Sequence, residues 1–232
     1  MKYILVLLTV VLALFLIYRS SRGSLASAHV INLDRSVERL VAFRKNAEEV
    51  GLSVTRWPGI NGKALEASDM PRYGVPHHIY EKHATKKRLG VIGCYLSHST
   101  LLAHLGTIQC GQNDYHLIFE DDARLPADFM IQLPKIVAKL PADWDILQLY
   151  NNRPNTLPWH GNIHTLAPGE GNYGTVAYVV RHDALSKINA HVAVMRRPID
   201  NQLLEKSHDW KWFCMVPDMV HTDDGGKTTL ND

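Results

Sequence analysis

The pattern that most restricts the fold of this chain is a strand, a helix and a second strand in direct succession. His29–Leu33 is a short apolar run that ends in polar residues, and Val54–Trp57 is a second run of strand type. Between them, Ser36 can cap a helix that Gly51 ends. The apolar stripe of this helix consists of Leu40, Phe43, Ala47 and Val50. Two strands joined through a helix pair in parallel, so the sequence predicts an α/β fold.

The segments that follow continue this alternation. Helices are expected over 91–108, over 129–140 and from Asp183, and strands over 115–119, 144–150, 174–181 and 212–216. Residues 58–88 are rich in Gly, Pro, His and Lys and have weak periodicity, which predicts a long surface loop. The C-terminal end is expected to be irregular. A chain of this length can form one sizeable core, which we place in a single domain over residues 29–232.

Three consecutive carboxylates follow one of the predicted strands. The run Tyr115–Phe119 delivers Glu120, Asp121 and Asp122 at its end. Ligands of open α/β sheets bind at the carboxyl ends of the strands, and adjacent carboxylates repel one another unless a cation or hydrogen-bond donors compensate. A hard divalent cation that also bridges to a diphosphate would do so. The alternative is that these three acidic residues form a polar turn that caps the next element and bind no ligand.

Charge and cysteine content limit the partners. The chain holds 25 Lys+Arg and 23 Asp+Glu, but residues 1–28 contain three basic residues and no acidic one, which leaves 22 basic against 23 acidic residues elsewhere. A balanced domain exerts no long-range attraction on nucleic acid, so no nucleic-acid partner is expected. Cys94, Cys110 and Cys214 are widely spaced and form no CxxC pair, which indicates reduced, largely buried thiols.

The N-terminal segment has the composition of a membrane anchor. Ile4–Ile17 contains a single polar residue, and Tyr3 and Tyr18 flank it where interfacial aromatic residues are expected. The apolar run is slightly short for a spanning helix. A cleaved signal peptide is the alternative, because Ala26–Ala28 has the form of an A-x-A site. We expect residues 1–28 to form an anchor and tether.

Basic residues around this segment indicate its orientation. Lys2 precedes the apolar run, and four arginines follow it: Arg19, Arg22, Arg35 and Arg39. The positive-inside rule then predicts a single-pass anchor with the C-terminal domain on the cytoplasmic face.

Five segments in a fixed order resemble glycosyltransferase family 25, the lipopolysaccharide- and lipooligosaccharide-type sugar transferases that are related to collagen galactosyltransferases. The segments are VINLDRSVERL, LGVIGCYLSHSTLLAHL, LIFEDDARL, YGTVAYVVRHDAL and RRPIDNQL. Each motif is weak alone, but their order and spacing match over about residues 30–221. The resemblance implies a GT-A type fold and an inverting transferase that uses a UDP-sugar, often UDP-galactose, with Mn²⁺ or Mg²⁺.

The resemblance also assigns catalytic and metal-binding roles. Asp122 is the expected direct metal ligand within the acidic motif, and His221 near the C-terminus is the expected second ligand, with Asp223 and Asp224 as substitutes. A neutral imidazole suits Mn²⁺. Asp200 is the expected general base that deprotonates the acceptor hydroxyl. Without the resemblance, Asp200 reads as a helix N-terminal residue after a proline.

Donor binding is assigned to residues after the first strand, on the Gly-Cys-x-x-Ser-His helix and in the acidic motif. These residues are Asn32, Asp34, Arg35, Arg39, Gly93, Ser97, His98, Glu120 and Asp121. Lys87 and Arg88 can offset diphosphate charge, although a solvated basic turn is the better explanation of them. The acceptor side is expected at 58–88 and at Asn151–His160.

Two other functions use the same residues. A metal-dependent hydrolase of phosphoesters or nucleotide sugars needs the same acidic cluster, although no G-x-x-x-x-G-K-[ST] loop is present. A non-catalytic sugar-nucleotide-binding module on a membrane tether needs the donor site but no base. The donor sugar and the acceptor depend on pocket shape, which the sequence does not reveal.

Overall fold

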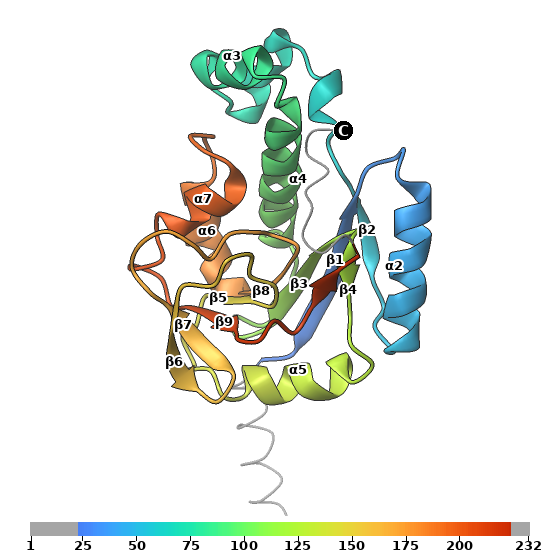
Figure 1. Cartoon of the computed structure of the whole chain (residues 1–232), viewed down its shortest axis with the longest axis vertical. Helices are drawn as coiled ribbons and strands as arrows, with labels where there is room; N and C mark the ends of the chain where they lie inside the picture. The colour runs from blue at the N-terminus through green and yellow to red at the C-terminus, as the bar shows by residue number, and fades with distance from the viewer. Residues whose placement is uncertain (1–22, 224–232) are drawn as a thin grey trace, which may run out of the picture.

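The computed structural model of the chain describes residues 23–223. Their centre is an eight-stranded mixed sheet, shown in Figure 1. The strands lie in the order β2 (Thr55–Pro58), β1 (Leu25–Asn32), β3 (Tyr115–Glu120), β8 (Ala177–Arg181), β5 (Ile146–Gln148), β9 (Trp212–Met215), β7 (Ile163–Leu166) and β6 (Thr156–His160). The α/β fold class is therefore confirmed.

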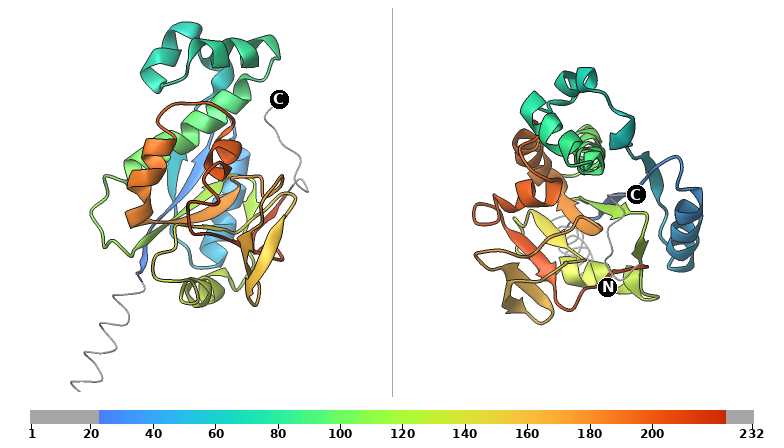
Figure 2. Two further views of the ribbon diagram at one scale, coloured as in Figure 1. Left: turned by 90° about the vertical axis from the view of Figure 1, so that its left-hand side faces the viewer. Right: turned by 45° about the horizontal axis from the view of Figure 1, so that its top comes forward.

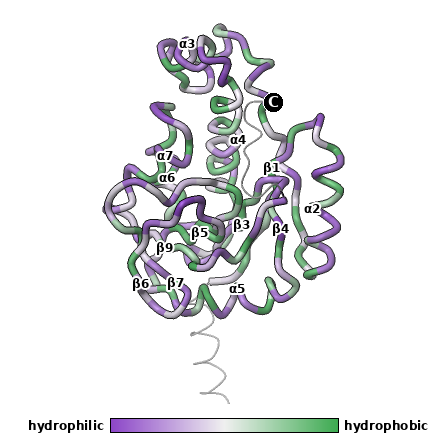
Figure 3. The backbone as a smooth tube through the Cα atoms, viewed as in Figure 1, coloured by the Kyte–Doolittle hydropathy of each residue, from purple (hydrophilic) through white to green (hydrophobic). Residues whose placement is uncertain are grey.

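The parallel pairing predicted for the first two strands is confirmed. β1 pairs in parallel with both β2 and β3, and α2 (Val37–Glu49) makes the crossover. Figure 3 shows hydrophobic and hydrophilic residues alternating along α2, as expected for a helix with one face on the sheet. Ser36 stands at the N-cap position, but its side chain makes no capping hydrogen bond. β8 is antiparallel to its neighbours β3 and β5.

Helices cover both faces of the sheet. Along β3, Leu117 and Phe119 belong to one core with α2 and α5 (Phe129–Val137), whereas Ile118 belongs to a second core. This second core holds α4 (Leu89–Leu105), α6 (Leu185–His191) and α7 (Ile199–Leu204). The near-continuous apolar sequence of β3 follows from this burial on both faces.

The prediction of a long surface loop over 58–88 is wrong for most of that segment. It forms η1 (Gly62–Ala64), η2 (Ala67–Tyr73) and α3 (His77–Thr85). Met70, Val75 and Ile79 are buried in the core that contains α4. Figures 1 and 2 show α3 packed at the far end of α4. The short helices gain their stability from this contact rather than from their own periodicity.

Two further pairs of strands were not predicted. β6 and β7 form a hairpin at the sheet edge, so part of the expected Asn151–His160 loop is a strand. β10 (His221–Thr222) pairs antiparallel with β4 (Ala123–Arg124). This second pair brings the C-terminal end of the described chain beside the acidic motif.

The start of the domain also differs from the predicted boundary. β1 begins at Leu25 rather than His29, and Ser27 pairs with His116 of β3, so Ala26–Ala28 lies inside the sheet. The predicted anchor Ile4–Ile17 lies outside the described residues and stays a prediction. Among residues 23–223, no helix is long and apolar enough to cross a membrane.

Candidate active site

A cavity of about 600 Å³ opens at the carboxyl ends of β1 and β3. Its walls come from the connection after β1, the segment after β2, α4, the end of β3, the segment before β8 and the start of α7. The cavity therefore lies where an α/β sheet is expected to bind its ligands. It gathers most of the predicted site residues, namely Asn32, Arg35, Arg39, Ser97, His98, Glu120, Asp121, Asp122 and Asp200.

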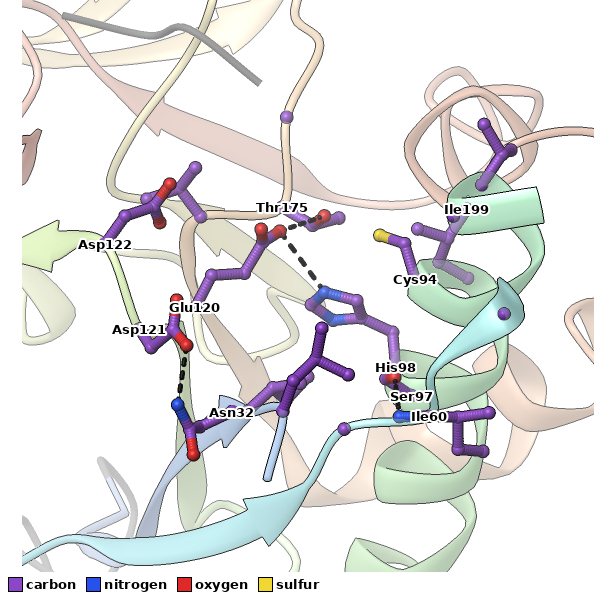
Figure 4. A pocket seen from close by; sticks show the side chains of 18 of the residues that line it. Asn32, Ile60, Cys94, Ser97, His98, Glu120, Asp121, Asp122, Thr175 and Ile199 are labelled. Atoms are coloured by element: carbon purple, nitrogen blue, oxygen red, sulfur yellow. Dashed lines mark hydrogen bonds and ion pairs between the residues drawn. The ribbon is translucent and has the colours of Figure 1, made fainter. Parts of the chain in front are cut away.

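Glu120 is held by two polar partners on neighbouring elements. Its Oε1 atom lies 3.3 Å from Nε2 of His98 and accepts a hydrogen bond of 2.8 Å from the Thr175 hydroxyl. Figure 4 shows the Glu120 carboxylate between these two side chains. Burial alone would raise the pKa of Glu120, but the hydrogen bond and charge of His98 outweigh it and lower the pKa. Glu120 is therefore a carboxylate with a fixed orientation.

Asp121 anchors the connection after β1 to the end of β3. The Asn32 amide donates to its Oδ2 at 2.7 Å, and Arg39 lies 3.2 Å from its Oδ1. Burial raises the pKa of Asp121, and the Asn32 hydrogen bond and the Arg39 charge partly oppose that rise. Both carboxylate oxygens of Asp121 thus have protein partners, which indicates that Asp121 holds the cavity wall in shape.

Asp122 differs from the other two acids. Its Oδ1 atom is buried and has no hydrogen-bond partner among the described residues. Burial, followed by the negative charge of Glu120, raises its pKa to about 7. A buried carboxylate oxygen without a donor is costly unless a proton or a cation satisfies it. Together with Glu120, Asp122 offers the oxygen ligands that Mn²⁺ or Mg²⁺ prefers, so the residues present fit a divalent cation.

Asp34 is a predicted donor-binding residue that the structure places outside the cavity wall. Its side chain is largely exposed, forms an ion pair with Arg56 and does not line the cavity. Arg56 also donates to Oδ1 of Asn32 at 2.9 Å, which fixes the Asn32 amide toward Asp121. Asp34 therefore contacts the cavity wall only indirectly, because it pairs with Arg56 and Arg56 bonds to Asn32.

Gly93 also lies outside the cavity wall, for a packing reason. A Cβ atom on Gly93 would lie 2.4 Å from the carbonyl oxygen of Ile60 and 2.5 Å from the nitrogen of Gly62. One turn further along α4, Ser97 accepts a hydrogen bond of 2.8 Å from the Ile60 nitrogen. The missing side chain therefore lets α4 touch the segment that forms one wall of the cavity.

His221 does not reach the cavity. Its side chain is exposed on β10, whereas that of the next residue, Thr222, lines the cavity. Successive side chains of a strand point to opposite faces, so His221 points away when Thr222 points in. The predicted pairing of His221 with Asp122 is therefore absent from this arrangement. Asp223 pairs instead with Arg124, and Asp224 lies outside the described residues.

Asp200 enters the cavity from the first turn of α7. Its Oδ1 atom accepts hydrogen bonds from the backbone and side-chain nitrogens of Asn201, at 2.8 and 3.0 Å. Its Oδ2 atom lies 3.3 Å from the Gly174 nitrogen. The carboxylate is thus oriented by its own helix and by the segment before β8. It comes from a different wall than the acidic motif.

Sequence reasoning missed several cavity residues. Cys94 lines the cavity beside Glu120 and His98, and Figure 4 shows its sulfur pointing toward the same space as Thr175. Thr175 belongs to the YGTVAYVVRHDAL segment, so the resemblance of this segment could have identified it as a site residue. Lys63 lines the cavity, whereas the suggested Lys87 and Arg88 are exposed and do not.

Comparison with known proteins identifies the family. The sequence profile described as glycosyltransferase family 25 (LPS biosynthesis protein) matches residues 26–203. The chain belongs to glycosyltransferase family 25. The profile spans β1 to α7 and so includes the acidic motif and Asp200, whereas His221 lies beyond it.

Individual members of family 25 are distant relatives. A glycosyltransferase 25 family member of Drosophila pseudoobscura pseudoobscura is 27% identical over 168 residues, which cover 69% of this chain and 26% of that protein. One from Anopheles gambiae is 26% identical over 71% of this chain and 28% of that protein. A Bos taurus protein named probable inactive glycosyltransferase 25 family member 3 is 26% identical over 80% of this chain and 32% of that protein. The family 25 chain thus spans about a quarter to a third of the length of these relatives.

A solved structure of a Drosophila galactosyltransferase 7 mutant, in complex with manganese, UDP-Gal and xylobiose, is similar at a TM-score of 0.41 and 9% identity. The match covers 85% of this chain and 69% of that chain. Similarity at this level does not by itself establish a common fold.

Proposed function

We propose that this chain is a metal-dependent glycosyltransferase with a GT-A type fold. It transfers galactose or a related hexose from a UDP-sugar to a saccharide or glycoconjugate acceptor, with inversion, in the synthesis of lipopolysaccharide-type cell-surface glycans. The observation that carries the proposal is the unpartnered Asp122 carboxylate oxygen beside Glu120, in a cavity at the carboxyl end of β3 of a family 25 chain.

Asp122 and Glu120 would hold the metal. Asp122 has a free oxygen for direct contact, and Glu120 keeps its negative charge because His98 and Thr175 bond to it. When bound, Mn²⁺ or Mg²⁺ offsets the negative charge of the diphosphate leaving group.

Basic and polar side chains on the neighbouring wall fit a nucleoside diphosphate. Arg35, Arg39 and Lys63 line the cavity and bring positive charge to it. Guanidinium groups match phosphate oxygens in geometry as well as in charge. Asn32 keeps Arg39 close by sharing Asp121 with it.

Asp200 would act as the general base. Inversion in one step needs a carboxylate that removes the proton of the acceptor hydroxyl while its oxygen attacks the anomeric carbon. Asp200 lines the cavity, and its partners hold it in one orientation. The acceptor would enter from the side of α7 and the segment before β8.

The test is a screen of the full chain with Mn²⁺ against UDP-sugars and non-uridine donors, with and without acceptor saccharides. We expect UDP release that rises when an acceptor is present and that chelation abolishes. Asp122→Ala should lose this activity, whereas the matched control Asp209→Ala, an exposed acid paired with Lys206, should keep it.

Other outcomes would assign other functions. UDP release that is independent of the acceptor would indicate a hydrolase. Binding of UDP without any turnover would indicate a non-catalytic module. This outcome is of interest because the bovine relative carries the words probable inactive in its name. Activity with non-uridine donors alone would overturn the donor assignment.

We further propose that the segment before β1, which begins at Leu25, tethers the domain to the cytoplasmic face of a membrane. The support is the apolar run Ile4–Ile17 and the arginines that follow it. Cell fractionation followed by protease treatment of sealed vesicles tests this, since a domain on the cytoplasmic face is protected in right-side-out vesicles and cleaved in inverted ones.

A further inference from the structure

A second group of metal-type ligands lies at the other end of β3. Cys110 follows α4, His116 is the second residue of β3, and His182 is the first residue of η3 (His182–Ala184). We refer to these three residues as the Cys110 cluster. Their ligand atoms all lie within 4.8 Å of one another. Glu120 follows His116 by four positions of extended strand, or about 13 Å, so the cluster is distinct from the cavity.

The distances in the Cys110 cluster approach those of a tetrahedral zinc site. Nε2 of His116 lies 3.0 Å from Nδ1 of His182, and Sγ of Cys110 lies 4.0 Å from the same Nε2 atom. Zinc bonds of about 2.0–2.1 Å to nitrogen and about 2.3 Å to sulfur put tetrahedral ligands about 3.3–3.6 Å apart. The His116–His182 and Cys110–His116 distances would therefore need to change by only about half an ångström to admit the ion.

The fully buried His116 ring is oriented as a metal ligand would be. Its Nδ1 atom is 2.8 Å from the Ser27 hydroxyl, which in turn lies 3.0 Å from Nε2 of His29. A proton on Nδ1 of His116, donated to Ser27, leaves the Nε2 lone pair directed at Cys110 and His182. Metal-binding histidines almost always fix their second nitrogen through such a bond. Burial lowers the pKa of His116 to about 4, so the ring is neutral, as ligation requires.

The backbone around the cluster is already fixed. The Asp114 carboxylate accepts hydrogen bonds from the nitrogens of Gly111 and Ser24, at 2.8 and 2.7 Å. The nitrogen of His182 donates to the Asp114 carbonyl at 2.8 Å. Asp114 thus holds the Cys110 loop, the start of the described chain and η3 together. A metal ion could therefore bind without having to order these segments.

We infer that Cys110, His116 and His182 bind one zinc ion, with a solvent-facing fourth position, as a structural site that joins the loop after α4 to β3 and η3. One thiolate and two imidazoles are a ligand set that zinc accepts and that Mn²⁺ and Mg²⁺ do not favour. A hydrogen bond from Nδ1 of His182 to Nε2 of His116 accounts for their 3.0 Å contact without the ion. With zinc bound, His182 would carry its proton on Nε2 instead, and the Cys110 thiol would release its proton to solvent.

The experiment is a cobalt titration of the full chain, reduced and treated with chelator, with Co²⁺ as the spectroscopic stand-in for zinc. We expect one equivalent of Co²⁺ to give a thiolate-to-cobalt charge-transfer band and Zn²⁺ to displace it. Cys110→Ser should abolish the band. Cys94→Ser, which removes the thiol near the proposed active site, is the matched control and should keep it.

His182→Gln is a second variant on a partly exposed side chain, and it should weaken cobalt binding at least tenfold. Circular dichroism reports whether each variant is folded, and either variant alone suffices if the other is not. Absence of the band in the wild type, its persistence in folded Cys110→Ser, or its loss in folded Cys94→Ser would each overturn the proposal. None of these readouts depends on sugar transfer.

Discussion

The imidazole of His98 faces Glu120, with Nε2 3.3 Å from Oε1 of the carboxylate. The other ring nitrogen lies 3.1 Å from the hydroxyl of Tyr178 on β8. His98 is almost fully buried, so one ring joins α4, the end of β3 and β8 beneath the cavity. The orientation of Glu120 therefore depends on a helix that is distant from it in sequence.

Replacing His98 by leucine should affect both stability and the pH dependence of transfer. The variant leaves the buried Tyr178 hydroxyl without this partner and removes one of the two hydrogen bonds to Glu120, which costs on the order of 1–3 kcal/mol in the free energy of unfolding. The pKa of Glu120 is lowered by His98, so its loss raises that pKa and moves the acidic limb of activity to higher pH. Urea unfolding and a pH–rate profile measure the two effects.

Tyr178→Phe is the matched control for His98→Leu. It removes one hydrogen bond but keeps the contact between His98 and Glu120, so it should cost about 1 kcal/mol and leave the acidic limb in place. An equal shift of the limb in both variants would contradict the direct role of His98.

Asp122→Asn should stabilise the metal-free chain at high pH. The pKa of Asp122 is raised to about 7 in the folded chain, above its ordinary value near 3.8, by burial and by Glu120. Stability from the protonated form is present below pH 3.8 and is lost as the pH rises through about 7. The asparagine carries no charge, so the variant should gain on the order of 1–3 kcal/mol at pH 8 and little at pH 4.

Thermal unfolding with chelator at both pH values checks this gain. Asp209→Asn is the control, because Asp209 is exposed and its pKa is lowered by the hydrogen bond from Lys206. Adding Mn²⁺ should make the wild type more stable than Asp122→Asn, since the ion stabilises the wild type but not the variant. Stabilisation of both proteins by Mn²⁺ to the same extent would remove Asp122 from the metal site.

Gly93→Ala should destabilise the chain and distort the cavity wall. The added carbon would meet backbone atoms of Ile60 and Gly62 at 2.4 and 2.5 Å, and backbone cannot move aside cheaply. We expect a loss of about 1–3 kcal/mol. Gly106→Ala is the control, because Gly106 has helical dihedrals and its nearest neighbour is the Asn189 side chain at 3.1 Å. Equal losses in both variants, measured by chemical denaturation, would contradict the packing argument.

Strong local patterns were sufficient for the central part of the fold. The strand–helix–strand opening and the buried run of β3 were predicted because burial on both faces leaves continuous apolar sequence. The helices over 67–85 were missed because Met70, Val75 and Ile79 are sparse and find their partners on α4. The β6 strand was missed because its edge position leaves most of its residues exposed and allows Pro158.

In the site, too, local sequence patterns predicted some features, whereas others depend on contacts between distant segments. The acidic motif was recognisable because three carboxylates end a buried strand, but which of them lacks a partner depends on Asn32, Arg39 and His98. Cys94 was taken for a core thiol because α4 is apolar around most of its circumference, and its periodicity does not mark the face toward the cavity. Asp34 and His221 were misplaced because a motif fixes position in sequence, not the direction of a side chain.

The role of Asp200 can be separated from donor binding. Asp200→Asn keeps the shape of the side chain and can keep the contact of its oxygen with the Asn201 nitrogen, but it cannot accept a proton. If Asp200 is the base, kcat should fall by about 10²–10⁴-fold. The Kd for UDP-sugar, measured by calorimetry, should stay within about twofold.

A variant beside Asp200 distinguishes proton transfer from positioning. Asn201→Ala removes the 3.0 Å hydrogen bond from the Asn201 side chain and leaves the 2.8 Å bond from its backbone, so the carboxylate remains but is held less firmly. A general base that is held less firmly loses only a small part of its effect, so kcat should fall about 10-fold or less. The larger fall in Asp200→Asn would then reflect the loss of the carboxylate that accepts the proton. A donor-affinity defect with unchanged kcat in Asp200→Asn would mean that Asp200 binds the UDP-sugar and that another group removes the acceptor proton.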